Sequence, residues 1–247
     1  MARRALVTGA ASGIGRATVK ALRKDGYDVL ATSRRMGQLK ALAEETGCEF
    51  CPADLTSEDG RANLLRYIAL GEPIDILVNV AGGALGTDPV ANGKLDEWRQ
   101  MFELNVLATL ALTQSLLPHM REAGGDVVFI TSTAAHGTYP GGAGYTAAKH
   151  AERMIPNTLR LELVGEPVRL IEIAPGMVKT EEFSLNRLHG DAAAAENVYA
   201  GVAEPLIAED IAEAVRWCVG LPAHMNIDSM IIRPVAQASN TLVARKL

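Results

Sequence analysis

Cysteine is scarce in this chain, with three residues in 247, a number that suits a reducing compartment and gives no basis for a disulfide framework. Cys48 and Cys51 form a C-x-x-C spacing. That spacing falls on a short strand-like segment, where positions i and i+3 face opposite sides, whereas redox pairs usually lie at a helix N-terminus. A zinc site would need a second pair, and only Cys218 remains. The pattern favours buried cysteines over a redox or metal site.

The chain also lacks a surplus of positive charge and any long apolar run. Its net charge is −5, so no sequence-independent attraction to nucleic acid or to an anionic membrane is expected. No apolar run reaches the length of a membrane span. A strand-like segment begins within a few residues of the N-terminus, which leaves no room for a signal peptide. The five histidines show no metal-ligand spacing. We expect a cytoplasmic protein without a metal.

Strand-like and helix-like segments alternate along the whole sequence. Short apolar runs predict strands at 5–7, 27–31, 49–51, 74–78, 126–131, 168–174 and 228–232. Several runs are almost continuously apolar, which suits parallel strands covered on both faces. The segments between them have the period of amphipathic helices. The pattern predicts an α/β fold, a Rossmann-type doubly wound parallel sheet of about seven strands with helices on both faces.

No linker, charge block or repeat interrupts this alternation, so we expect one domain over residues 1–247. Residues 104–117 are apolar nearly all round, which predicts a helix buried on two sides. A second subunit is one way to cover its outer face. Residues 181–205 mix acidic, small and amide side chains, which is typical of a mobile loop with short helices that covers a substrate.

A glycine-rich run, Thr8–Gly15, follows the first strand and opens the first helix. Glycine lets the backbone turn tightly and approach a pyrophosphate, which rests on the helix N-terminus. The hydroxyl groups of Thr8 and Ser12 can add contacts. The spacing G-x-x-x-G-x-G therefore predicts a dinucleotide site, although a plain strand-to-helix turn is the alternative.

The second strand ends at Ser33-Arg34-Arg35. An acidic residue near this point would bind the adenosine ribose and select NAD, whereas arginine accommodates the 2′-phosphate of NADP. Ser33 stands where the acid would be, and arginine suits a phosphate contact. We therefore expect NADP as the cofactor; a solvated basic helix start is the alternative.

Tyr145 and Lys149 are spaced i and i+4, which places both on one face of a helix. A cation beside a phenol stabilises the phenolate, so we expect a lowered pKa for Tyr145. A tyrosine tuned in this way exchanges a proton with an alcohol near neutral pH. The pair alone is weak evidence, but together with a dinucleotide turn it predicts an alcohol dehydrogenase.

With Ser132, thirteen residues before Tyr145, these features resemble the short-chain dehydrogenase/reductase family over essentially the whole chain. The other motifs that carry the resemblance are Asp54-Leu55, Asn79-Val80-Ala81-Gly82, Asn105 and Pro175–Thr180. The chain departs from the family pattern at two positions. Val80 stands where asparagine is usual, and the absence of the amide would weaken the hydrogen bonds of that loop. Pro156 removes a backbone donor inside the helix after Lys149.

The resemblance implies roles for particular residues. The implied catalytic residues are Asn105, Ser132, Tyr145 and Lys149; Tyr145 would act as general acid and base, and Asn105 would hold a water that links Lys149 to solvent. The implied cofactor-binding residues are Thr8, Gly9, Ser12, Gly13, Ile14, Gly15, Ser33, Arg34, Arg35, Asp54, Leu55, Asn79, Ala81, Gly82, Tyr145, Lys149, Pro175, Gly176, Val178 and Thr180.

Loop segments are similar to the NADP-dependent 3-hydroxy acid (serine-type) dehydrogenase branch of that family. They are Gly83–Gly86, Tyr139–Gly142, Glu182–Ser184 with Arg187, Gly190-Asp191 and Leu221–Ile227. This similarity implies a small hydroxy acid, or the corresponding carbonyl compound, as substrate. The expected substrate contacts are Ser132, His136, Tyr145 and Arg187. Arg187 would clamp the carboxylate unless it is a solvated loop arginine, and His136 would line the pocket rather than carry a proton.

Two other functions remain open at this level. A broad-range aldehyde/ketone reductase would have the same residues, because a pocket of small and aromatic side chains does not name its ligand. A non-catalytic NADP-sensing protein would typically lose the tyrosine or lysine, and both are present. Apolar helices at about 97–118 and 144–164, together with the self-association that the family resemblance implies, predict a homotetramer or homodimer.

Overall fold

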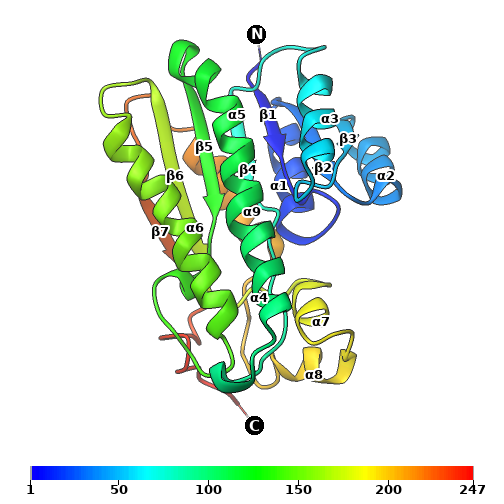
Figure 1. The fold of residues 1–247 in the computed structure, drawn as a ribbon, viewed down its shortest axis with the longest axis vertical. Coiled ribbons are helices and arrows are strands. Elements are labelled where there is room, and N and C mark those ends of the chain that lie inside the picture. Colours follow the sequence, from blue (N-terminus) through cyan, green and yellow to red (C-terminus); the bar gives the residue numbers. More distant parts are fainter. Residues whose placement is uncertain (1, 247) are drawn as a thin grey trace.

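The computed structural model describes residues 2–246 and contains one seven-stranded sheet, in the order β3-β2-β1-β4-β5-β6-β7 (Figure 1). Every neighbouring pair of strands is parallel. The strands are β1 (Arg4–Val7), β2 (Asp28–Ser33), β3 (Glu49–Pro52), β4 (Ile76–Asn79), β5 (Gly125–Ile130), β6 (Val168–Pro175) and β7 (Ser229–Ile232). The predicted parallel sheet of about seven strands is confirmed.

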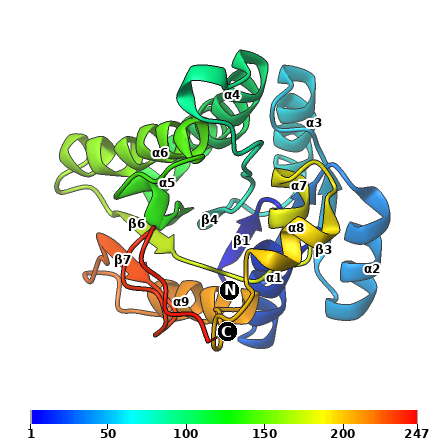
Figure 2. The same ribbon diagram turned by 90° about the horizontal axis from the view of Figure 1, so that it is seen from below.

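Helices cover both faces of the sheet, as the alternating sequence pattern predicted. Figure 2 shows α3, α5 and α6 on one side of the strands and α1, α2 and α9 on the other. The longer helices are α1 (Gly13–Lys24), α2 (Met36–Thr46), α3 (Glu58–Ile68), α4 (Leu95–Phe102), α5 (Ala108–Ala123), α6 (Ala143–Glu162) and α9 (Ala208–Val219). The shorter elements are η1 (Val90–Asn92), η2 (Glu103–Leu107), η3 (Thr133–Ala135), α7 (Phe183–Arg187) and α8 (Ala192–Asn197).

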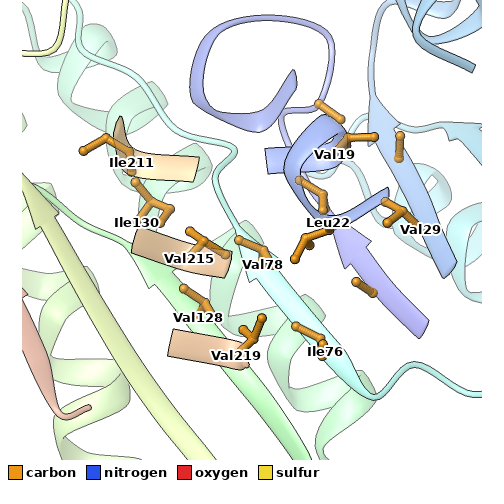
Figure 3. Close-up of a cluster of buried hydrophobic side chains, with 14 of the residues drawn as sticks. Val19, Leu22, Val29, Ile76, Val78, Val128, Ile130, Ile211, Val215 and Val219 are labelled. Atoms are coloured by element: carbon orange, nitrogen blue, oxygen red, sulfur yellow. The ribbon is translucent and has the colours of Figure 1, made fainter. Parts of the chain in front are cut away.

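The alternation of side chains along each strand builds two separate core layers. In β4, Ile76 and Val78 pack in the layer with α1 and α9 (Figure 3), while Leu77 packs in the layer with α3 and α5. Successive strand residues point to opposite faces, so a strand covered on both faces must be apolar throughout. Each fully buried aliphatic side chain of this kind contributes about 1.5–3 kcal/mol.

The order of the strands reverses between β1 and β4, which pair although α1, β2, α2, β3 and α3 separate them in the chain. In open parallel sheets, such a reversal creates a crevice at the carboxyl ends of the strands. In Figure 1, α7 and α8 lie beyond those ends. They belong to residues 181–205, which we name the covering segment.

The apolar helix predicted at 97–118 is in fact three consecutive elements. α4 is followed by η2, a π-helical turn, and then by α5. Within one chain α5 buries one face, whereas Leu107 just before it is 49% exposed. Pro156 lies inside α6, which continues through it. Among residues 2–246, no helix has the length and apolarity that crossing a membrane requires.

Candidate active site

A cavity of about 970 Å³ occupies the crevice at the carboxyl ends of the strands. It gathers most of the residues that the sequence predicted for the cofactor, from the segments that follow five strands and from α6. These are Gly9, Ser12, Gly13, Ile14, Gly15, Ser33, Arg34, Arg35, Asp54, Leu55, Ala81, Gly82, Tyr145, Pro175, Gly176, Val178 and Thr180. The remaining predicted cofactor residues, Thr8, Asn79 and Lys149, are buried behind this lining.

The glycine-rich turn between β1 and α1 depends on the absence of side chains. Gly9 and Gly13 have positive φ angles of 63° and 49°, a region that L-residues with a Cβ rarely adopt. A Cβ on Gly15 would lie 2.3 Å from the Gly9 carbonyl oxygen. These three positions therefore require glycine, and the N-terminus of α1 is left open toward the cavity.

Thr8 ties this turn to the loop after β4. Its Oγ1 accepts hydrogen bonds from the backbone N–H groups of Val80 and Ala81, both at 2.9 Å. The contact uses the backbone of residue 80, so valine in place of asparagine leaves it intact. Asn79 points away from the cavity and donates from Nδ2 to Thr113 Oγ1 at 3.4 Å. Thr8 and Asn79 thus support the lining rather than form part of it.

At the end of β2, Arg35 is bound to the covering segment. Its Nη2 donates to Ser12 Oγ at 2.9 Å and to Glu182 Oε2 at 2.8 Å, and Ser12 Oγ donates to the same carboxylate oxygen at 2.8 Å. Hydrogen bonds from Arg35 and Ser12 hold the pKa of Glu182 below its usual value, although its partial burial opposes them. Glu182 was not predicted as a site residue. It lies 147 positions from Arg35 in the chain, so no local pattern indicates the contact.

Tyr145 and Lys149 are both buried on one face of α6, as their spacing predicted. Lys149 Nζ is 6.0 Å from the centre of the Tyr145 ring and donates to the carbonyl oxygen of Ile130 at 3.1 Å. The Tyr145 ring makes an edge contact with Phe183 of the covering segment, with the ring centres 5.7 Å apart. Tyr145 lines the cavity, and Lys149 is buried behind Tyr145.

The expected lowering of the Tyr145 pKa is wrong for the protein alone. Burial raises the pKa of Tyr145, and it outweighs the lowering by Lys149 and by the Ser132 hydroxyl. The Lys149 ammonium, 6.0 Å from the centre of the Tyr145 ring, is itself paired with a carboxylate. Tyr145 is therefore a protonated phenol at neutral pH.

That carboxylate belongs to Glu152, which the sequence did not lead us to predict. Lys149 Nζ lies 2.5 Å from Glu152 Oε2 and both side chains are buried. Burial raises the pKa of Glu152 to about 7, even though Lys149 lowers it. Burial alone would lower the pKa of Lys149, but Glu152 keeps it above its usual value. The spacing of three residues from Lys149 was the available signal.

Ser132 follows β5 and forms the N-cap of η3. Its Oγ accepts a hydrogen bond from Ala134 N at 3.1 Å and donates to the Pro175 carbonyl oxygen at 3.4 Å. The first bond fixes the rotamer of the side chain, because an N-cap oxygen must face the first turn. Ser132 thereby presents its hydroxyl to the cavity beside Tyr145.

Asn105 lies in the π-helical turn η2 and is fully buried. Its Oδ1 accepts from Gly83 N at 3.1 Å, and its Nδ2 donates to Gly83 O at 2.9 Å. A Cβ on Gly82 would lie 2.7 Å from Asn105 Oδ1 and 3.3 Å from Lys149 Nζ. The side chain thus fastens the loop after β4 beside Lys149.

The two predicted substrate residues outside this cluster have different positions. Arg187 lines the cavity and donates to Tyr139 Oη at 3.0 Å, to Gly141 O at 2.9 Å and to Gly86 O at 3.3 Å. His136 is not among the lining residues. Its Nε2 lies 3.0 Å from the buried carboxylate of Glu172, so its position gives no support to a substrate contact.

The C-terminal segment also reaches the cavity, which the sequence did not indicate. Gln237 Oε1 accepts from Met177 N at 2.8 Å, and Asn240 Nδ2 donates to Thr133 O at 3.0 Å. Both residues line the cavity. Cys48 and Cys51 are buried free thiols, as predicted, and Cys218 is one as well. Residues 2–246 contain no cluster of His, Cys, Asp or Glu that could hold a metal ion.

Comparisons with known proteins agree with this geometry. A family model described as short chain dehydrogenase matches residues 3–188. Similar proteins include an uncharacterised oxidoreductase of Mycobacterium tuberculosis, 48% identical and covering 95% of this chain and 92% of its own. A serine 3-dehydrogenase of Agrobacterium fabrum is 42% identical, covering 94% of both chains. An NADP-dependent 3-hydroxy acid dehydrogenase, YdfG, of Escherichia coli is 38% identical over 94% of this chain and 95% of its own.

Among solved structures, the closed form of a serine dehydrogenase complexed with NADP+ matches with a TM-score of 0.91. It is 36% identical to this chain, and the match covers 99% of this chain and 100% of the other. The similarity therefore extends to the covering segment and the C-terminal residues, beyond the part matched by the family model.

Proposed function

Because this chain belongs to the short-chain dehydrogenase/reductase family, we propose that it is an NADP-dependent oxidoreductase of a small hydroxy acid and the corresponding carbonyl compound. The observation that carries this proposal is the convergence of Ser132 and Tyr145 on one cavity, with Lys149 behind them. A hydroxyl donor, a protonated phenol and a buried cation together suit proton transfer to an oxygen that becomes an alcohol.

The cavity fits a dinucleotide phosphate. A Cβ at Gly9 would lie 3.0 Å from Ala81 N and one at Gly15 2.3 Å from Gly9 O, so glycine keeps the turn tight at the N-terminus of α1, where a pyrophosphate finds backbone N–H donors. β2 itself ends in Ser33 and not in an acidic residue, and Arg34 and Arg35 line the cavity there, which favours a 2′-phosphate over a bare ribose. The names of the relatives and the solved NADP+ complex support the same cofactor. When bound, NADP supplies the hydride chemistry.

In reduction, Tyr145 donates its phenol proton to the carbonyl oxygen, and in oxidation it takes the proton back. The raised pKa of Tyr145 keeps the proton available at neutral pH. Ser132 donates a hydrogen bond to the same oxygen, where its stabilisation is greatest as negative charge develops. The positive charge of Lys149, behind the phenol, limits the increase that burial causes in the pKa of Tyr145.

Asn105 fixes the position of the loop that carries Gly82 and Gly83 next to Lys149. We assign it a positioning role, and the water that the family resemblance implies at this residue remains an expectation. Thr8 has the same kind of role for Val80 and Ala81.

The covering segment closes the substrate end of the cavity in this proposal. Phe183 contacts the Tyr145 ring, and Arg187 reaches the loops that carry Gly86 and Gly141. Arg187 uses three hydrogen bonds in these contacts, while a guanidinium has five N–H donors. The remaining donors suit a substrate carboxylate, which supports the hydroxy-acid assignment over a neutral alcohol.

A screen of NADPH and NADH oxidation against semialdehydes, β-keto acids and neutral ketones tests the proposal. Turnover restricted to the acidic substrates with NADPH is the expected result, and the Tyr145→Phe variant should lose turnover but keep NADPH binding. Comparable turnover of neutral ketones would indicate the broad aldehyde/ketone reductase instead. Stoichiometric NADPH binding without turnover of any substrate would indicate a sensor.

A further inference from the structure

The buried carboxylate of Glu152 lies on α6 together with Tyr145 and Lys149, and the proposed proton transfer does not use it. Glu152 follows Tyr145 by seven residues and Lys149 by three, so the three side chains share one helix face. Its Oε2 lies 2.5 Å from Lys149 Nζ, and the exposed fractions of the two side chains are 1% and 4%. Glu152 thus lies in direct contact with the group that supports Tyr145.

Burial makes the loss of either partner of this pair costly. An unpaired charge in a protein interior is costly, and a buried ion pair whose partner is removed leaves that cost uncompensated. Lys149 is therefore held by Glu152 on one side and by the Ile130 carbonyl oxygen on the other. Above its pKa of about 7, Glu152 is a carboxylate that balances the positive charge of Lys149.

The charged groups that act on Glu152 are few. On its own helix the charged group is Lys149, and from β6 it is the carboxylate of Glu172; Glu152 in turn acts on the phenol of Tyr145. Glu172 is also fully buried. It accepts from Thr131 Oγ1 at 2.8 Å, lies 3.0 Å from His136 Nε2 and has Arg153 Nε at 3.6 Å.

We propose that Glu152 is a positioning residue whose negative charge keeps both Tyr145 and Lys149 protonated, so that Tyr145 remains a proton donor at higher pH. The inference rests on the proposed function for the roles of those two residues. Lys149 and Tyr145 titrate as a coupled pair, so the first proton lost belongs to the pair. A nearby carboxylate disfavours that loss from either group. In agreement, burial is the main cause of the raised pKa of Tyr145 and Glu152 adds to it, and Glu152 raises the pKa of Lys149 against the lowering by burial.

The substitution Glu152→Gln tests the proposal, because it removes the negative charge and keeps the shape of the side chain. Carbonyl reduction needs a phenol and an ammonium, so its rate falls when the pair loses its first proton. We expect the alkaline limb of the kcat/KM profile to move to a pH lower by about one unit, a tenfold change in proton affinity. Glu162→Gln is the matched control, because Glu162 is an exposed glutamate of the same helix; its profile should coincide with that of the unsubstituted enzyme.

A second readout does not depend on turnover. NMR titration of protein with ¹³C-labelled Tyr and Lys side chains, assigned with Tyr145→Phe and Lys149→Met, follows the two groups directly. The first proton loss of the pair should occur at lower pH in Glu152→Gln. An unchanged titration overturns the inference, even if the enzyme is active. A shifted titration without turnover of any substrate overturns the proposed function and leaves the inference standing.

If Glu152→Gln does not fold, a crystal structure of the unsubstituted protein above neutral pH decides the matter. A Glu152 carboxylate within hydrogen-bond distance of Lys149 Nζ supports the proposal. A carboxylate turned away from Lys149 overturns it.

Discussion

Arg35 and Glu182 join the end of β2 to the covering segment through an ion pair in which Nη2 lies 2.8 Å from Oε2. Ser12 of the glycine-rich turn donates to the same carboxylate at 2.8 Å. In the proposed NADP site, this carboxylate occupies the donors that the 2′-phosphate would use, since both anions seek the same guanidinium and hydroxyl groups. We therefore expect NADP binding to compete with this internal contact.

Substitution Glu182→Gln should consequently strengthen NADP+ binding. The pair is partly exposed, so its removal is worth no more than about 1 kcal/mol, or about fivefold in Kd. We expect a two- to fivefold lower Kd for NADP+ and an unchanged Kd for NAD+, measured by calorimetry. Glu181→Gln, a change at the exposed neighbouring glutamate, is the matched control and should alter neither value. Weaker NADP+ binding in Glu182→Gln would show that Glu182 assists the cofactor instead of competing with it.

Cofactor choice should also respond to Ser33, which ends β2. A carboxylate in Ser33→Asp would repel a 2′-phosphate and accept hydrogen bonds from ribose hydroxyl groups. We expect the Kd for NADP+ to rise by at least about tenfold, or about 1.4 kcal/mol, and the Kd for NAD+ to fall. Ser33→Ala removes only the bond that Ser33 Oγ accepts from Arg35 N at 3.2 Å, so it should change both affinities little. Equal losses for both cofactors in Ser33→Asp would mean that the β2 end does not select NADP.

The contrast between these residues shows how far the sequence alone could go. The helix spacing of Tyr145 and Lys149 and the glycine requirement at Gly9 are local, so a single sequence predicts them. Glu152 was within reach of the same argument, because it continues the face of those two residues. The contact between Arg35 and Glu182 was not, since it depends on how a distant segment packs over the sheet.

The direction of a side chain was a second feature that the sequence alone could not predict. His136 comes shortly after Ser132, and that proximity suggested a pocket residue. Its ring faces Glu172 of the neighbouring strand β6 instead, because a buried carboxylate needs hydrogen-bond partners. The net effect on the Tyr145 pKa was equally hidden, since burial and the pairing of Lys149 with Glu152 are tertiary features.

The two-layer core predicts a clear difference between two leucines. Leu112 of α5 is fully buried against the sheet, whereas Leu70 just after α3 is 88% exposed. Leu112→Ala should lower the free energy of unfolding by about 2–5 kcal/mol, because it removes buried methyl groups and leaves a cavity. Leu70→Ala should change it by less than about 0.5 kcal/mol. Urea unfolding of both variants at one protein concentration measures the difference; similar values would contradict the assigned core.

Arg187 decides between a hydroxy-acid enzyme and a broad reductase. If it clamps a substrate carboxylate, Arg187→Ala should raise KM for acidic substrates by at least about tenfold, the loss expected for a charge-assisted hydrogen bond of about 1.5–3 kcal/mol, and leave KM for neutral carbonyl compounds unchanged. Its bonds to Tyr139, Gly141 and Gly86 suggest a second role in holding α7. Tyr139→Phe separates the two roles, since it removes one of these acceptors and keeps the cation; steady-state kinetics should then show little change for either substrate class. If Arg187→Ala impairs acidic and neutral substrates equally, Arg187 only holds the covering segment, and the carboxylate must be bound elsewhere.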